Sequence, residues 1–292
     1  MKKNLLQKLF LTSILFMIIL TIYTIPSFSH LKVLRTNLEI QKPFPGLSQK
    51  IYLFNKENLL VRTEIFLEEK EDFEKIEDII EYLKENEKES SLKGYLPKNI
   101  QLLEKRQNED TLILNFSKEW EEVEKEDEKV AGFLYSMLEL DEIQKVKILI
   151  EGNLSRKYPN ALDKTFGMNK EYQVNSREDI QKVFLYYYDK EGYLLPITRY
   201  VNDNREKIEV MIEELKTGSN HEISYLKDKT KLLGYKEEKN VFYLNFDSHL
   251  YEKSKEIEEK VIATISESIF QNYDVNMVIL EIEGELYQTY SK

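Results

Sequence analysis

The chain has 292 residues, which is enough for two domains of common size, and its formal net charge is −11 at pH 7. An acidic protein lacks the clustered positive charge that binding to nucleic acid or to an anionic lipid surface requires, so neither is expected as a direct partner. The sequence contains no Cys, and this excludes disulfides, thiolate metal sites, a cysteine nucleophile and a lipid-modified cysteine.

Residues 1–30 are predicted to be a signal peptide or a membrane anchor. Lysines precede an uncharged apolar run from Leu9 to Ile25. The run is at the short limit for crossing a bilayer, and Ser27 and Ser29 are small enough for signal cleavage, so both alternatives stay open. The positive charges before the run place the rest of the chain outside the cytoplasm in either case. We therefore expect an exported protein, either membrane-anchored or secreted.

Two linkers are expected from composition. Residues 31–48 contain Pro43 and Pro45 and show no sustained periodicity, and residues 155–180 contain Pro159 among scattered charges. The second linker separates two similar stretches of sequence, and its length leaves their relative orientation open.

The remaining sequence occurs twice. The matching strings are IYLFNKENLLVRTEIF at 51–66 with VFLYYYDKEGYLLPITRYV at 183–201, LILNFSKEW at 112–120 with FYLNFDSHL at 242–250, and KILIEGN at 147–153 with ILEIEGE at 279–285. Units of this length are much longer than solenoid repeats, so they predict two tandem copies of one domain, at 49–154 and 181–292.

Periodicity gives the order of elements within each copy. In the second copy two β-rich runs, 182–188 and 194–200, flank a turn; a helix with one apolar face follows and stops at Gly218. A hairpin, a longer helix and a last strand complete the copy, and the first copy follows the same pattern. The predicted order is ββαββαβ, an α+β domain with a mixed sheet packed by two helices.

Two triplets stand between a strand and a helix, Asn115 to Ser117 and Asn245 to Asp247. Ser117 and Asp247 are expected to accept hydrogen bonds from free N–H groups at the helix start. A metal site at Asp247 and His249 lacks a third ligand in the sequence, so it is not favoured.

Arg199 and the tyrosines at 186–188 each have two interpretations. Arg199 is expected to pair with an acid or to cap carbonyls, and a partner contact is the less favoured alternative. Alternation along the strand places Tyr187 opposite its neighbours, so at least one ring is exposed unless the sheet is covered. An exposed tyrosine would favour contact with another protein.

These residues resemble the GerMN domain of the sporulation and spore germination family, in a tandem arrangement similar to its two-domain members. The family pattern contains a Leu-x-Pro-x-Thr-Arg strand, a Leu-x-x-Gly helix end, a Leu-Pro turn, a strand ending in Asp or Asn, apolar, Ser, and a last strand ending in Gly. The residues that carry the motifs are Pro97, Asn115, Ser117 and Gly152 in the first copy, and Pro196, Arg199, Gly218, Asn245, Asp247 and Gly284 in the second. The copies therefore retain different parts of the pattern.

The resemblance implies a non-catalytic envelope module whose fold is similar to ring-building motifs of secretion-type assemblies. Its implied partners are envelope or sporulation-channel proteins, or further copies of itself. Two-domain members are typically lipoproteins, and since this chain has no Cys, attachment would depend on the uncleaved run at 9–25 or on a partner.

No catalytic residue, cofactor or metal site is predicted. The three histidines show no triad or zinc spacing, and there is no Gly-rich phosphate loop. The alternative function is a cell-wall hydrolase or glycan-binding protein that uses carboxylates which cannot be picked out among 53 acidic residues.

Overall fold

The computed structural model describes residues 47–68, 70–85 and 91–292. These residues lie in one compact unit, Glu39–Lys292. The predicted export segment 1–30 and nearly all of the linker 31–48 lie outside the described residues. Within the described ranges no helix is both long enough and apolar enough to span a membrane.

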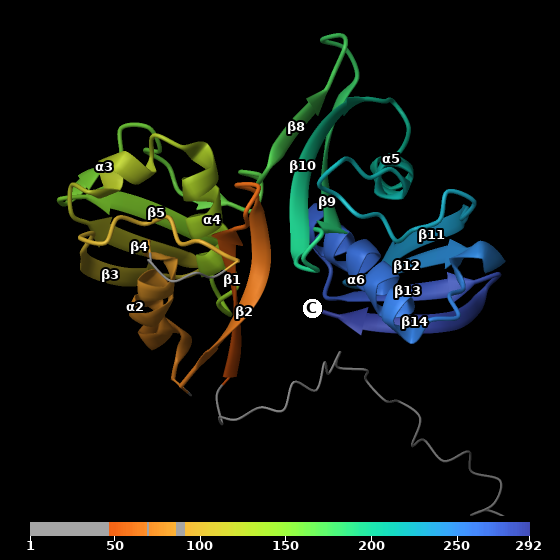
Figure 1. The fold of residues 1–292 in the computed structure, drawn as a ribbon, viewed down its shortest axis with the longest axis horizontal. Coiled ribbons are helices and arrows are strands. Elements are labelled where there is room, and N and C mark those ends of the chain that lie inside the picture. The colour runs from red at the N-terminus through yellow and green to blue at the C-terminus, as the bar shows by residue number, and fades with distance from the viewer. Residues whose placement is uncertain (1–46, 69, 86–90) are drawn as a thin grey trace, which may run out of the picture. The chain divides into compact units, whose positions relative to one another are not determined.

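Both copies have the predicted order of elements (Figure 1). The first copy consists of β1 (Leu47–Phe54), β2 (Leu60–Leu67), α2 (Asp72–Leu83), β3 (Leu102–Asn108), β4 (Thr111–Phe116), α3 (Trp120–Val123), α4 (Asp127–Leu138) and β5 (Lys145–Ile150). The second consists of β9 (Ile180–Tyr188), β10 (Leu194–Asn202), α5 (Lys207–Lys216), β11 (Leu232–Glu238), β12 (Val241–Phe246), the 3-10 helix η1 (Ser248–Leu250), α6 (Lys255–Asn272) and β13 (Met277–Ile282). The ββαββαβ order and the α+β class are confirmed.

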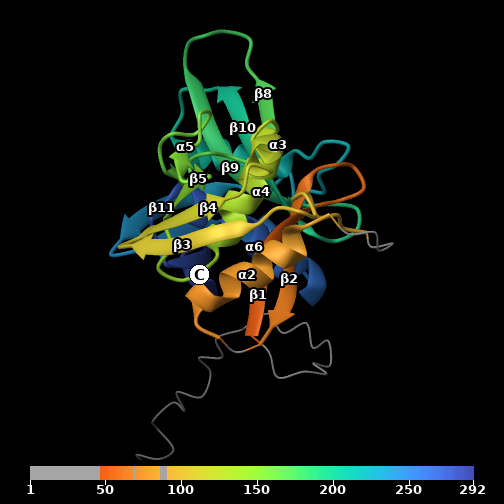
Figure 2. The ribbon, with the colours of Figure 1, turned by 90° about the vertical axis from the view of Figure 1, so that its left-hand side faces the viewer.

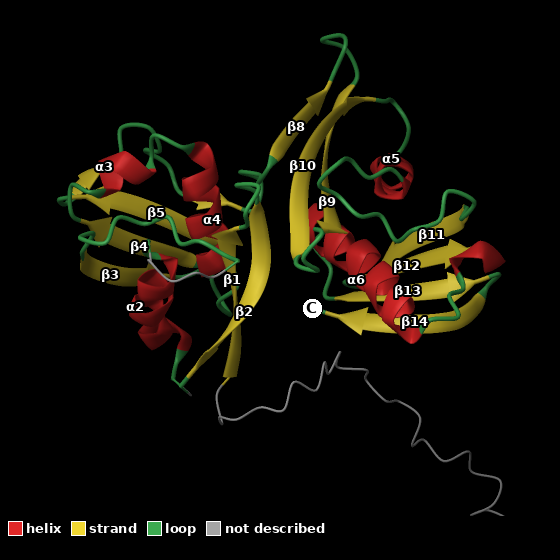
Figure 3. Cartoon of the chain, in the orientation of Figure 1, coloured by secondary structure: helices red, strands yellow, loops and turns green. Residues whose placement is uncertain are grey.

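The strands of each copy divide between two sheets, a detail that periodicity does not predict (Figure 3). In the first copy β1 and β2 form one hairpin, while β3, β4 and β5 belong to a second sheet in which β4 and β5 run parallel. Parallel neighbours need a crossover, and α4 supplies it. The second copy repeats this with β11, β12 and β13, crossed over by α6.

The crossover helices α4 and α6 pack against both sheets of their copies and are buried on all sides over most of their length. Each carries a fully buried serine that bonds to the edge of the hairpin. Tyr52 N donates to Ser136 Oγ at 3.0 Å, and Tyr186 N donates to Ser268 Oγ at 2.9 Å. The helix side chain thus satisfies a strand N–H that would otherwise be buried without a partner.

The hairpins of the two copies join in one sheet of order β1-β2-β10, with β9 on the far side of β10. Strands β2 and β10 are neighbours in Figure 1, whereas Figure 2 shows β1 and β2 lower in the view than β9 and β10. Strands β2 and β10 pair antiparallel through Arg62 and Leu194. The hydrophobic cores also meet, because Val61 of the first copy packs in the core of the second.

The segment 155–180, predicted as a linker, contributes strands to both copies. Strand β7 (Leu162–Asp163) pairs with β5, and β8 (Lys170–Gln173) pairs parallel with β10. Strands of two and four residues are too short to show periodicity, which explains why the sequence gives no indication of them.

Each copy also continues beyond the predicted last strand. The pairs Glu151–Gly152 and Glu283–Gly284 have φ values of 49° and 79°, and of 52° and 86°. Two consecutive left-handed residues make the tight turn that suits a two-residue hairpin. The turns lead into β6 (Asn153–Leu154) and β14 (Glu285–Ser291), which pair with β5 and β13.

Candidate interaction site

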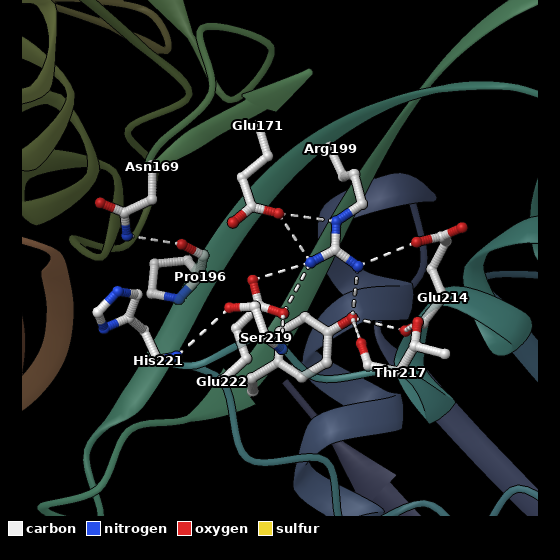
Figure 4. Close-up of polar contacts among 10 residues, drawn as sticks. Asn169, Glu171, Pro196, Arg199, Glu214, Thr217, Ser219, His221 and Glu222 are labelled. Atoms are coloured by element: carbon white, nitrogen blue, oxygen red, sulfur yellow. Dashed lines mark hydrogen bonds and ion pairs between the residues drawn. The ribbon is translucent and has the colours of Figure 1, made fainter. Parts of the chain in front are cut away.

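Arg199 lies on β10 and is 2% exposed. Its guanidinium contacts three carboxylates (Figure 4), one from β8, one from α5 and one from the loop after α5. Nε donates to Glu171 at 2.9 Å, Nη1 to Glu214 at 2.9 Å, and Nη2 to both oxygens of Glu222 at 2.8 and 2.7 Å. The structure therefore contains the predicted pairing of Arg199 with an acid. These ion pairs hold β8, α5 and the loop to β10.

The charges in this cluster are not balanced, because one cation faces three carboxylates. Burial raises the pKa of Glu222, and the neighbouring Glu171 raises it further, whereas Arg199 lowers it; the net direction is upward. For Arg199, burial alone lowers the pKa, but Tyr187 and Glu222 outweigh burial and raise it. The arginine stays charged, while the carboxylates compete for it.

Tyr187 is fully buried, so its ring is not exposed to another protein. Strand β9 packs against both α5 and α6, so the sheet is covered. The phenol accepts from Arg199 Nη1 at 3.1 Å and donates to the carbonyl of Glu214 at 2.6 Å. Neither Tyr187 nor Arg199 presents a surface to a partner.

The predicted Asn and Gly motif residues act together in both copies. Asn115 Oδ1 accepts from Gly152 N at 2.8 Å, and Asn245 Oδ1 accepts from Gly284 N at 2.9 Å. Each asparagine lies on the outward face of a central strand and holds the tight turn that follows the next strand. This hydrogen bond occurs in both copies, and it explains why asparagine and glycine occupy these positions.

Ser117 does not cap a helix, contrary to the expectation. Its hydroxyl accepts from Gln101 N at 3.0 Å and ties the end of β4 to the start of β3. Asp247 makes the equivalent bond with Lys231 N at 3.0 Å and also accepts from His249 N at 3.3 Å, at the start of η1. The role of Asp247 at a helix start is thus confirmed. Among the described residues no group of three His, Cys, Asp or Glu side chains could hold a metal.

Pro196 lies where β10 changes partner. The backbone N–H of Thr198 points away from β9 and donates to Met168 O at 2.8 Å, so the position two residues earlier also faces away from β9. Proline therefore removes no bond from the β9 ladder. The Asn169 side chain bridges the gap: its Nδ2 donates to Pro196 O at 2.7 Å and to Leu60 O at 2.8 Å. Asn169 thereby connects the two copies.

Gly218 follows the end of its helix, as predicted, but it is not in a left-handed conformation; glycine is needed there for space. Helix α5 ends at Lys216, and a Cβ at Gly218 would lie 2.4 Å from the carbonyl oxygen of Glu222. In the first copy a glycine is also needed for space, because a Cβ at Gly94 would lie 2.1 Å from Lys84 O at the end of α2. Pro97 follows in that loop, and its carbonyl accepts from Ile100 N at 3.1 Å before β3 begins.

One exposed apolar feature recurs in both copies. Leu103 on β3 and Leu233 on β11 are 48% and 54% exposed, and each is the extra residue at a register shift in its strand. Strands β3 and β11 are the end strands of their sheets within the described part of the chain. Sequence reasoning missed these leucines, although the repeated Leu-Leu pairs at 102–103 and 232–233 could have indicated them.

The family described as Germane, sporulation and spore germination, matches residues 50–155 and 184–288, which is more than half of the chain. The chain belongs to this sporulation and spore germination family. The two matched ranges coincide closely with the two copies of the structure.

The tandem GerMN domains of the sporulation protein GerM from Bacillus subtilis share this arrangement of the Germane family. That structure is 20% identical, with a TM-score of 0.73, and the match covers 85% of this chain and 97% of that one. At this identity the likeness establishes the fold, tandem arrangement included.

Two further structures match less of the chain. The first GerMN domain of the same Bacillus subtilis protein is 21% identical, with a TM-score of 0.34, over 38% of this chain and 86% of that one. A putative lipoprotein from Clostridium perfringens is 15% identical, with a TM-score of 0.26, over 41% and 92%. A search of curated protein sequences gave no match.

Proposed function

We propose that this Germane-family chain is a non-catalytic, extracytoplasmic interaction module that takes part in assembling a sporulation-type complex in the cell envelope. Its partners are envelope or sporulation-channel proteins or further copies of itself. The N-terminal segment holds it at the membrane if that segment is not cleaved.

The proposal rests on an exposed leucine that occurs at the same place in both copies. A single exposed leucine is ordinary on a protein surface. Leu103 and Leu233, however, occupy the same place in both copies, at the start of an end strand where backbone groups are open to pairing. Docking of an extended partner segment on such an edge uses backbone hydrogen bonds for affinity and an apolar side chain for placement.

The family and the tandem fold support the sporulation setting. The burial of Arg199 and Tyr187 supports a structural role for both, because their hydrogen bonds hold the second copy together. Leu103 and Leu233, which are exposed in both copies, then remain as the positions that contact another protein.

The test is crosslinking and affinity capture from envelopes of cells that are entering sporulation, with the full chain as bait. The double variant Leu103→Lys, Leu233→Lys should lose most of the captured envelope protein while keeping its fold. Tyr82→Lys, which replaces an exposed side chain on α2, is the matched control and should retain capture. Capture of no envelope protein by the unaltered chain, combined with glycan hydrolysis by the purified chain, would establish the cell-wall enzyme instead.

A further inference from the structure

The contact between the two copies has the pattern of a two-fold symmetric dimer. Residues at equivalent positions face one another: the hydroxyls of Tyr52 and Tyr186 are 3.5 Å apart. Arg62 pairs with Leu194 in the ladder, and their counterparts Pro196 and Leu60 are bridged by the Asn169 side chain, so the contact is centred on the equivalent residues Val61 and Leu195. An interface in which the same patch of each partner meets itself is isologous, as in dimers of identical subunits.

The hairpin turns repeat the pattern with reciprocal ion pairs. Lys56 contacts Glu191 at 2.5 Å, and Lys190 contacts Glu57 at 3.6 Å. The turns of the two copies, 55–59 and 189–193, therefore meet in the way that two identical turns would.

At two positions the corresponding residues of the two copies differ in chemistry. In each case the residue of one copy bonds to a residue of the other. The first is the pair Asn55 and Asp189, both 3% exposed. The Oδ1 atom of each accepts backbone N–H groups in its own turn. The remaining atoms face each other, and Asn55 Nδ2 donates to Asp189 Oδ2 at 3.0 Å. One copy has a donor where the other has a charged acceptor.

The second difference concerns the pair Arg62 and Glu267. Their bond is bidentate, at 2.8 Å from Nη1 and 2.6 Å from Nη2, and both side chains are largely buried. By the correspondence of the copies, Arg62 is replaced in the second copy by Pro196, and Glu267 is replaced in the first by Tyr135. The ion pair therefore exists once, in one direction.

We propose that these two pairs make the interface selective for unlike copies. Two second copies would place Asp189 against Asp189 and leave Glu267 buried beside Pro196 without a cation. Two first copies would leave Arg62 facing Tyr135, with its bidentate partner Glu267 gone and only Glu139 of its own copy, 4.0 Å away, beside it. A buried charge that loses its partner is strongly unfavourable, so pairing of like copies is disfavoured.

The inference goes beyond the proposed function, because it concerns which surfaces are used inside the chain. Each copy's β2 or β10 edge is occupied by the other copy of the same chain, and like copies of different chains do not compete for it. Contacts with other proteins are then directed to the remaining edges.

The experiment exploits the absence of cysteine from the sequence. In the full chain, Lys56→Cys and Glu191→Cys are introduced together and joined by a short bismaleimide. Rapid crosslinking within one chain is expected. Adding Asn55→Asp should slow it at least tenfold, and adding Asp189→Asn to that variant should restore it, because donor and acceptor are then exchanged. Should Asn55→Asp prevent folding, the exchanged variant still has to fold and crosslink.

Chains carrying a single cysteine test the selectivity. Lys56→Cys and Glu191→Cys should each crosslink between chains no faster than Lys239→Cys, which is on an exposed turn. Faster crosslinking between like positions, unchanged crosslinking in Asn55→Asp, or failure of the exchanged variant to recover would each overturn the inference. These outcomes do not depend on capture of envelope proteins, so they are separable from failure of the proposed function.

Discussion

Two buried arginines in this chain are neutralised in different ways. Arg62, at the interface of the copies, forms a bidentate pair with Glu267, and Glu139 is 4.0 Å away. Arg199, inside the second copy, faces the three carboxylates of its cluster. The pKa of Glu267 is lowered to about 2, whereas the pKa of Glu222 is raised. The bidentate pair keeps the Glu267 carboxylate charged and connects the two copies, while the three carboxylates around Arg199 compete with one another.

The difference also separates two roles. The Arg62 pair connects the copies, so its loss should uncouple them. The Arg199 cluster fastens a loop and the β8 strand to one copy, so its loss should loosen that copy alone. Substitutions of these arginines and their acids test the distinction.

Arg199→Met should have the largest effect, because it leaves three carboxylates together without a cation. Removing one partner of a buried ion pair costs about 3–5 kcal/mol, and the upper part of that range is expected here. Urea denaturation gives the free energy of unfolding. Arg205→Met, which removes an exposed pair with Asp203, is the control and should change it by about 0.5 kcal/mol or less. Equal losses in both variants would contradict the account.

Glu267→Gln should come next. It leaves Arg62 buried with a neutral partner, and hydrogen bonds to charged groups contribute about 1.5–3 kcal/mol. The matched variant is Glu222→Gln, for which a loss of about 1 kcal/mol or less is expected, because Arg199 keeps two other carboxylates. If Glu222→Gln is the more damaging of the two by urea denaturation, the comparison of the clusters is wrong.

Acid should weaken the chain through Glu267. Burial alone would raise the pKa of this carboxyl, but Arg62 lowers it from 4.5 to about 2. A carboxyl with a lowered pKa in the folded chain stabilises the fold above pH 4.5, and that contribution is lost as the pH falls towards 2. The separation of the two values corresponds to about 3 kcal/mol. Glu222, with its raised pKa, acts in the opposite direction. Unfolding free energy measured across this range should fall less steeply in Glu267→Gln; parallel curves would refute the assignment.

The smallest effect is expected for Glu214→Gln. Its side chain is 22% exposed, and Arg199 retains Glu171 and Glu222. A loss below about 1 kcal/mol is expected, as for ion pairs in contact with solvent. Thermal unfolding detects it, and a loss as large as that of Glu267→Gln would show that the carboxylates do not compete.

The sequence predicted what is local and repeated. Doubling of the strings around Asn115 and Asn245 indicated the order of elements and the strand ends at Gly152 and Gly284, but not the hairpin strands that follow them. It did not predict the joined hairpins, because pairing of β2 with β10 depends on how the copies meet. The acids that neutralise Arg62 and Arg199 could not be identified among 53 candidates, since Glu267 is 205 residues from Arg62 in sequence. Burial of Tyr187 likewise depends on the packing of α5.

The most direct test of the central claim, that the copies form one unit, uses the single tryptophan of the sequence. Trp120 is buried in the core of the first copy, stacked on Phe116 at 4.6 Å, so its fluorescence follows that copy, whereas far-UV circular dichroism follows both. In urea titration of the full chain the two signals should share one midpoint, and the midpoints should separate in Arg62→Met. Two separate midpoints in the unaltered chain would contradict the account.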